Sequence, residues 1–243
     1  MPFLALPNEI VLQISKFQSP PDINSLLKTS RRFAALLKPE LIDAACCADY
    51  SSYGKLAIYK AASCNDYDMV KHLLAKGLQR HERAILHDAT STDPNSTTTM
   101  EILLACGIDP DGRNDRGRTA LSHAASEKAG GKAVEFLLKY PQVKVTVDSY
   151  DSDRRTALGL AAKMGNERIV GRLLANGAEV DWVDKRGLTP LLLASSKGHD
   201  RIVRLLLYNN ANINWADHGG RTSLHIAAAF GHEGVVKVLL GPR

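Results

Sequence analysis

No stretch of the sequence is apolar for long enough to cross a membrane as a helix, which takes roughly 18–20 residues. The longest apolar run, Leu188 to Ala194, is interrupted by Thr189-Pro190. The apolar start of the chain follows no basic residue and leads to no small-residue cleavage pattern, so we expect no signal peptide. We therefore expect a soluble protein with no membrane partner.

Cysteine is scarce, and its placement excludes the usual bridged or metal-bound arrangements. None of the four cysteines forms a C-x-x-C pair, and two of them are adjacent: Cys46, Cys47, Cys64 and Cys106. Neither a disulfide framework nor a zinc site is expected from this pattern. Reduced thiols fit a protein of the cytoplasm or nucleus.

Catalytic motifs are missing as well. The sequence contains no G-x-S-x-G motif, and no second histidine follows His81-Glu82 at the spacing of a metal-binding helix. The run Gly130 to Ala133 lacks the first glycine and the final Ser/Thr of a phosphate-binding loop, so we interpret it as a loop insertion. We expect no enzymatic activity, no cofactor and no metal site.

Charge of one sign does not dominate either. Lysine and arginine number 31 against 26 acidic residues, which gives a formal net charge of +5 without any basic block. A nucleic-acid-binding tail is therefore not expected, although an acidic partner is slightly favoured. With 44% hydrophobic residues, the chain has enough apolar material to build a core.

What the sequence does contain is an internal repeat. Thr156, Thr189 and Thr222 lie 33 residues apart and each opens a similar run: T-A-L-G-L-A-A, T-P-L-L-L-A-S and T-S-L-H-I-A-A. In each unit a glycine then precedes an apolar stripe, as in Ile169, Val170, Leu173 and Leu174. This spacing indicates one buried helical face.

The repeat resembles the ankyrin family, and the stretch from Asp184 to Asp217 matches the family pattern almost throughout. The resemblance implies an all-α solenoid of helix-turn-helix units with short β-hairpin fingers. Weaker units precede the regular ones and contain insertions, and the first finger, after Gly77, is degenerate. We predict about six repeats over residues 46–243, the last without a C-terminal cap. Only Gly241-Pro242-Arg243 follows the last predicted helix, so we expect either a fragment of a longer array or an exposed apolar end.

The resemblance also assigns roles to histidines. In ankyrin repeats the histidine of T-P-L-H and the histidine after the helix-turn glycine are structural hydrogen-bonding groups. The corresponding residues here are His87, His225, His199 and His232.

The first part of the chain, residues 1–45, does not follow the repeat. It contains L-P-x-E-I-x-x-x-I, a proline-rich break, and then L-L-x-x-S-R-R-F-x-x-L, which resembles an F-box. This resemblance implies a helical module that binds the Skp-type adaptor of a cullin-RING ubiquitin ligase. The apolar residues expected at that contact are Leu6, Pro7, Ile10, Ile14, Leu26, Leu27, Phe33 and Leu36. The alternative is a helical cap that merely shields the first repeat.

Ankyrin repeats bind partners with their finger tips and the start of the turn between helices. Those positions here are Arg116, Arg118, Ser126 and Glu127 in unit three; Asp153, Arg155, Lys163 and Met164 in unit four; Lys185, Arg186, Leu188, Ser196 and Lys197 in unit five; His218, Arg221, Ala229 and Phe230 in unit six. Arg118, Arg155 and Arg221 share the slot before the threonine, which predicts a basic stripe for an acidic protein ligand. The alternative is that these cations only keep the solenoid soluble.

Three functional hypotheses follow. The first is a substrate receptor, in which the N-terminal module binds the adaptor and the repeats select a protein for ubiquitin transfer. The second is a scaffold or inhibitor with no link to a ligase. The third is an enzyme carried on a further part of a longer chain, which no residue in this sequence supports.

Overall fold

The computed structural model describes residues 61–62, 67–75, 86–87, 89–90, 97–127, 129–140 and 146–241. The module predicted for residues 1–45, with all its expected adaptor contacts, lies outside the described residues, as does the boundary at residue 46. The degenerate first finger after Gly77 lies outside them too.

The described residues form helices arranged in pairs. The first helices of the pairs are α8 (Ala120–Ser126), α11 (Ala157–Met164), α13 (Pro190–Ser196) and α15 (Ser223–Ala229). The second helices are α9 (Gly131–Leu137), α12 (Glu167–Ala175), α14 (Asp200–Tyr208) and α16 (Glu233–Leu240). α5 (Tyr67–Ala75) and α7 (Thr97–Ala105) precede these pairs, in the region of the weaker units.

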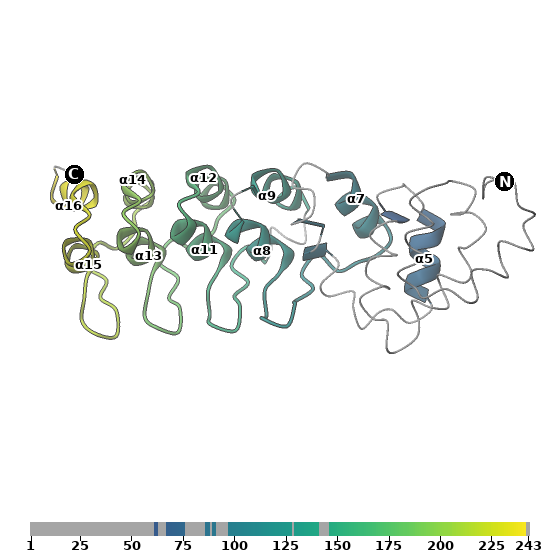
Figure 1. Cartoon of the computed structure of the whole chain (residues 1–243), viewed down its shortest axis with the longest axis horizontal. Coiled ribbons are helices and arrows are strands. Elements are labelled where there is room, and N and C mark those ends of the chain that lie inside the picture. Colours follow the sequence, from purple (N-terminus) through teal and green to yellow (C-terminus); the bar gives the residue numbers. More distant parts are fainter. Residues whose placement is uncertain are drawn as a thin grey trace, which may run out of the picture.

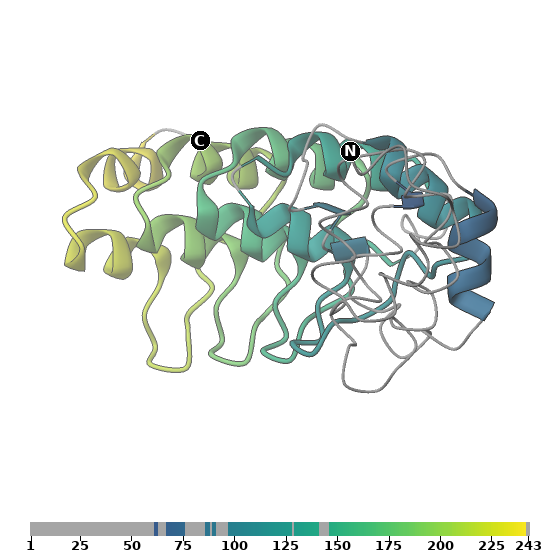
Figure 2. The same cartoon turned by 45° about the vertical axis from the view of Figure 1, so that its right-hand side comes forward.

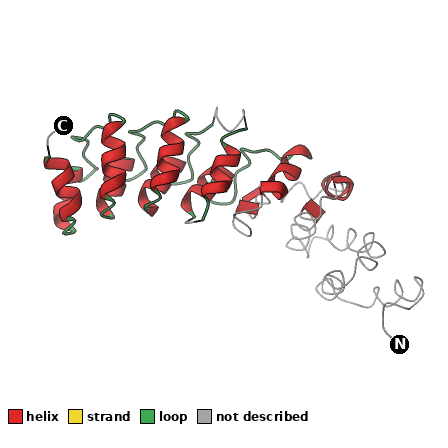
Figure 3. Cartoon of the chain, turned by 90° about the horizontal axis from the view of Figure 1, so that it is seen from above, coloured by secondary structure: helices red, strands yellow, loops and turns green. Residues whose placement is uncertain are grey.

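The pairs stack into an elongated array with two parallel rows of helices. One row contains α8, α11, α13 and α15, and the other contains α9, α12, α14 and α16 (Figure 1). Long hairpin loops project from the first row on one side (Figures 1 and 2). Seen from above, successive pairs follow one another along the array (Figure 3). α11 packs against both α8 and α13, so each unit contacts its neighbours.

The repeated threonine explains where the first helices begin. Thr119, Thr156 and Thr189 have extended backbones, and each side chain accepts a hydrogen bond from the amide three residues on, which satisfies a free helix N–H. Thr222 instead forms a reciprocal capping box with His225. The 33-residue register predicted from the sequence is confirmed at the helix starts after Thr156, Thr189 and Thr222.

The predicted loop insertion at Gly130 to Ala133 is wrong. Gly130 is the N-cap of α9, and Gly131 already belongs to the helix. Ala133, Val134 and Leu137 are 0% exposed, so the burial of one helical face compensates for the poor helix propensity of a glycine at its first residue.

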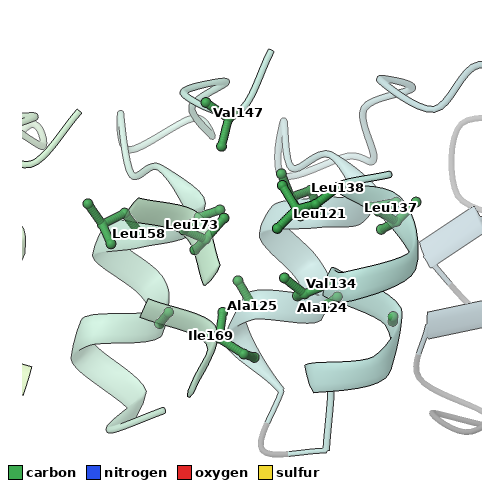
Figure 4. Packing of buried hydrophobic residues seen from close by; sticks show 14 of the residues in the cluster. Leu121, Ala124, Ala125, Val134, Leu137, Leu138, Val147, Leu158, Ile169 and Leu173 are labelled. Atoms are coloured by element: carbon green, nitrogen blue, oxygen red, sulfur yellow. The ribbon is translucent and has the colours of Figure 1, made fainter. Parts of the chain in front are cut away.

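The apolar stripes form one core between the two rows. Ile169, Val170 and Leu173 of α12 are at most 1% exposed. Figure 4 shows Ile169 and Leu173 in the same layer as Leu158 of α11, beside the equivalent layer of α8 and α9. Burying a side chain of this size stabilises the fold by roughly 1.5–3 kcal/mol, so the stacked layers hold the hairpin loops in fixed register.

We name the hairpin loops finger three (109–118), finger four (148–155), finger five (181–188) and finger six (214–221). They contain no strand among the described residues, and the predicted β-pairing is limited to a single antiparallel bridge from Ala216 to Thr222. A carboxylate closes each turn in fingers four to six. Asp151, for example, accepts the backbone amides of Asp153 and Arg155 at 2.9 Å.

Candidate partner-binding groove

We use the name groove for the surface formed by the second arm of each finger and the C-terminal end of the first helix that follows it. The contact from Arg118 Nη1 to Ser126 Oγ at 3.4 Å joins the two sides in unit three. The next unit along the chain contacts the C-terminal end of the first helix, since His199 Nε2 of unit five lies 3.3 Å from the carbonyl of Lys163 in unit four. His232 makes the same contact with the carbonyl of Ser196 at 3.2 Å. The groove is therefore assembled by neighbouring units together.

These contacts confirm the structural role predicted for the histidines. His87 Nε2 lies 2.6 Å from the carbonyl of Arg118, and His225 takes part in the capping box of α15. In each of these histidines one ring nitrogen faces a backbone group of its own or a neighbouring unit. Their hydrogen bonds hold the groove walls in place.

The structure brings together two members of the predicted basic stripe. Arg118 and Arg155 both pair with Oδ2 of Asp151, at 3.4 and 2.8 Å, although they come from different fingers. Their side chains are 14% and 19% exposed. Arg155 also contacts Asp153 at 2.6 Å. Part of the charge of the stripe is therefore neutralised within the protein.

The third member of the stripe is separate. Arg221 pairs with Asp217 of its own finger at 2.8 Å and is 66% exposed. Hydrogen bonds from the backbone and side chain of Arg221 lower the pKa of Asp217. In unit five the slot holds Leu188, so the stripe is interrupted between Arg155 and Arg221.

The charge of the Asp151 site is well stabilised. Burial alone raises the pKa of the Asp151 carboxyl, but hydrogen bonds from the Arg155 side chain and from the amides of Arg155 and Asp153 outweigh it and lower the pKa. Asp151 is therefore ionised in the folded protein at neutral pH. Its buried carboxylate is a fixed negative charge that pairs with the guanidinium groups of Arg118 and Arg155.

Lys163 is repelled by four other cations of the predicted contact surface. Its pKa is lowered, first by partial burial and then by repulsion from Arg155, Arg186, Lys197 and Arg118. These five residues belong to units three, four and five, and we call them the cation cluster. Crowding of like charges of this kind favours the binding of an anion.

The remaining predicted contact residues lie in the fingers and at the C-terminal ends of the first helices. Met164 and Phe230 precede the helix-turn glycines and are 39% and 64% exposed. Phe230 stacks on His232 with ring centroids 6.1 Å apart. Exposed positions at the finger tips and helix ends are Arg116, Glu127, Asp153, Lys185, Arg186, Lys197 and His218, while Leu188 is half-buried.

Sequence reasoning missed a second group of residues on the fingers. Arg113, Tyr150, Arg154 and Trp182 lie together at fingers three to five. The sequence did offer a signal for this group: Tyr150 directly precedes the turn residue Asp151, and Trp182 lies two residues before the turn residue Asp184. Arg154 also stands where fingers three, five and six have glycine.

No group of three or more His, Cys, Asp or Glu side chains in the described part of the chain is arranged to hold a metal ion. No helix there is long and apolar enough to span a membrane.

A family model described as ankyrin repeats (3 copies) matches the chain twice, over residues 86–184 and 158–243. The two matches overlap and together include every finger and helix pair that forms the groove. No curated protein sequence matches the chain.

Proposed function

We propose, since the chain belongs to the ankyrin-repeat family of protein-interaction modules, that its groove binds an acidic segment of a partner protein. The observation that carries this proposal is the cation cluster. Partial burial lowers the pKa of Lys163, and repulsion from cations of units three, four and five lowers it further. The protein acts without catalysis of its own, by holding a partner.

The charges available to a ligand are those that the protein does not neutralise. Lys163 and Lys197 take part in no ion pair among the described residues, whereas Arg118 and Arg155 share Asp151. A carboxylate bound between the two lysines relieves their repulsion and restores the pKa of Lys163 towards its usual value. Binding is therefore expected to weaken as salt concentration rises.

The test uses a fluorescein-labelled decaglutamate peptide and fluorescence anisotropy. The double variant Lys163→Glu with Lys197→Glu is expected to lose at least tenfold in affinity at low salt. A matched control, Lys132→Glu with Arg204→Glu, makes the same change in net charge at exposed positions of α9 and α14, and it is expected to lose less than twofold. Equal losses in the two variants would show that only net charge matters and would contradict the groove proposal.

We further propose that the chain is the substrate receptor of a cullin-RING ubiquitin ligase. The support is the F-box-like pattern of residues 1–45, in which Leu6, Pro7 and Phe33 stand at the family's apolar positions. The repeats then present the bound acidic protein for ubiquitin transfer by the ligase. This role places the protein in the cytoplasm or nucleus.

Co-purification with a purified Skp-type adaptor tests this second step. The full chain is expected to retain the adaptor, and the variant Leu6→Ala with Pro7→Ala is expected to lose it while still binding decaglutamate. If the full chain does not retain the adaptor, the protein is instead an ankyrin scaffold or inhibitor whose N-terminal helices act only as a cap.

A further inference from the structure

Finger four differs from its neighbours at one backbone position. The residue three places after the turn Asp or Asn is Gly117, Gly187 or Gly220 in the other fingers, and all three have left-handed φ angles of 70–78°. In finger four the same position is Arg154, with φ 59°. A residue with a Cβ is strained in this region. The strain at Arg154 calls for a function that glycine cannot perform.

The guanidinium of Arg154 lies over two aromatic rings. Its central carbon is 6.0 Å from the ring centroid of Tyr150 and 5.7 Å from that of Trp182. The rings stack with centroids 5.4 Å apart and an angle of 26° between their planes. Trp182 Nε1 donates a 2.9 Å hydrogen bond to the carbonyl of Arg154. Arg113 lies 5.8 Å from the centroid of Tyr150 and donates to its carbonyl.

We call Arg113, Tyr150, Arg154 and Trp182 the arginine–aromatic ladder. Both arginines are exposed, and Tyr150 is 45% exposed. No ion pair joins either arginine to a carboxylate among the described residues. Arg113 Nη1 donates to the carbonyls of Gly117 and Tyr150. The other N–H groups of Arg113 and the guanidinium of Arg154 are available to donate to a carboxylate.

The ladder and the cation cluster meet at finger four. Asp151 pairs with Arg155 of the cation cluster, and the adjacent Tyr150 stacks on Trp182 of the ladder. Arg154 and Arg155 are adjacent at the tip, so one segment that crosses finger four meets both surfaces.

We propose that the ladder is a second anion-binding site, which takes carboxylates of the same acidic protein segment after it leaves the groove across finger four. This inference rests on the proposed function. Charge complementarity selects the ligand: two exposed guanidinium groups that form no ion pair among the described residues recognise carboxylates, and the exposed ring of Tyr150 packs against the aliphatic part of an acidic side chain. Arg154 is retained in a strained backbone position because this contact requires its side chain.

The test uses tryptophan fluorescence in the full chain. The sequence has two tryptophans, so the variant Trp215→Phe leaves Trp182 as the only reporter. Titration with unlabelled decaglutamate is expected to change the emission of Trp182. Arg154→Gly introduces the residue found in the other fingers, so the protein is expected to fold with an equal or higher melting temperature. It is also expected to lose the fluorescence change and to bind labelled decaglutamate two- to fivefold more weakly at low salt.

Charge reversal with Arg154→Glu is expected to weaken binding further than Arg154→Gly. The inference is overturned if Arg154→Gly binds decaglutamate as the wild type does and keeps the Trp182 response. In that case the loss of binding in the Lys163→Glu, Lys197→Glu variant still supports the groove. If the wild type does not bind decaglutamate at all, both proposals fail.

Discussion

Replacing Asp151 with asparagine is expected to destabilise the array and to strengthen the binding of an acidic ligand. Asparagine keeps the oxygen that accepts the amides of Asp153 and Arg155, as Asn114 does in finger three. It removes the charge that pairs with Arg118 and Arg155. Two partly buried ion pairs at about 1 kcal/mol each give a loss of about 2 kcal/mol in the free energy of unfolding.

Asp184→Asn is the matched control for this change. Asp184 accepts the backbone amides of Arg186 and Leu188 in the same geometry. Its nearest cation, Arg186, is 3.8 Å away and 65% exposed. The control should therefore lose less than about 0.5 kcal/mol.

Urea denaturation and thermal melting measure the difference between the two variants. A loss of about 2 kcal/mol corresponds to a melting temperature lower by about 4–8 °C for a chain of this size. Decaglutamate affinity should rise about two- to fivefold in Asp151→Asn because Arg118 and Arg155 lose their internal partner. Equal destabilisation of both variants, or weaker peptide binding by Asp151→Asn, would refute the reasoning.

Three further predictions concern the core, the pH dependence and the contacts between repeats. Leu173→Ala, at a fully buried position, should lose about 3 kcal/mol in urea denaturation, whereas Leu240→Ala, 68% exposed, should stay within about 0.5 kcal/mol of the wild type. Burial raises the pKa of Asp148, so its ionised form costs stability as the pH rises above the ordinary value of 3.8. In thermal melts at pH 7, Asp148→Asn should therefore have the melting temperature of the wild type or a higher one, and the difference between the two proteins should vanish near pH 3. A clearly lower melting temperature of the variant at pH 7 would contradict this prediction. His232→Ala removes the contact with the carbonyl of Ser196 and should lose about 1 kcal/mol in urea denaturation, and an unchanged midpoint would show that this contact does not stabilise the stack.

The sequence predicted the helix starts because their signals are local. Thr156 or Thr189 caps the helix that begins at the next residue, so the 33-residue spacing is enough to place both. The buried stripe of Ile169, Val170 and Leu173 follows equally from helical periodicity. In contrast, the two glycines at the start of α9, Gly130 and Gly131, indicated a turn, and only the tertiary burial of that helix overrides their local preference.

The pairing of charged side chains could not be predicted in the same way. Arg118 reaches Asp151 from the preceding finger, 33 residues earlier in the chain. The stacking of Tyr150 on Trp182 depends on how the neighbouring fingers lie side by side. Spacing alone placed the arginines in one slot, but whether a carboxylate neutralises them depends on contacts between fingers.

The stacking of each helix pair on its neighbours, as α11 packs on α8 and α13, determines how the array responds to mechanical tension. A pull along its length loads the units in series, so every junction carries the whole force and the weakest one yields first. Extension then proceeds unit by unit as each layer of leucine and isoleucine separates. A bound segment that spans fingers three to five contacts units on both sides of these junctions, so ligand binding should raise the force at which units three to five separate.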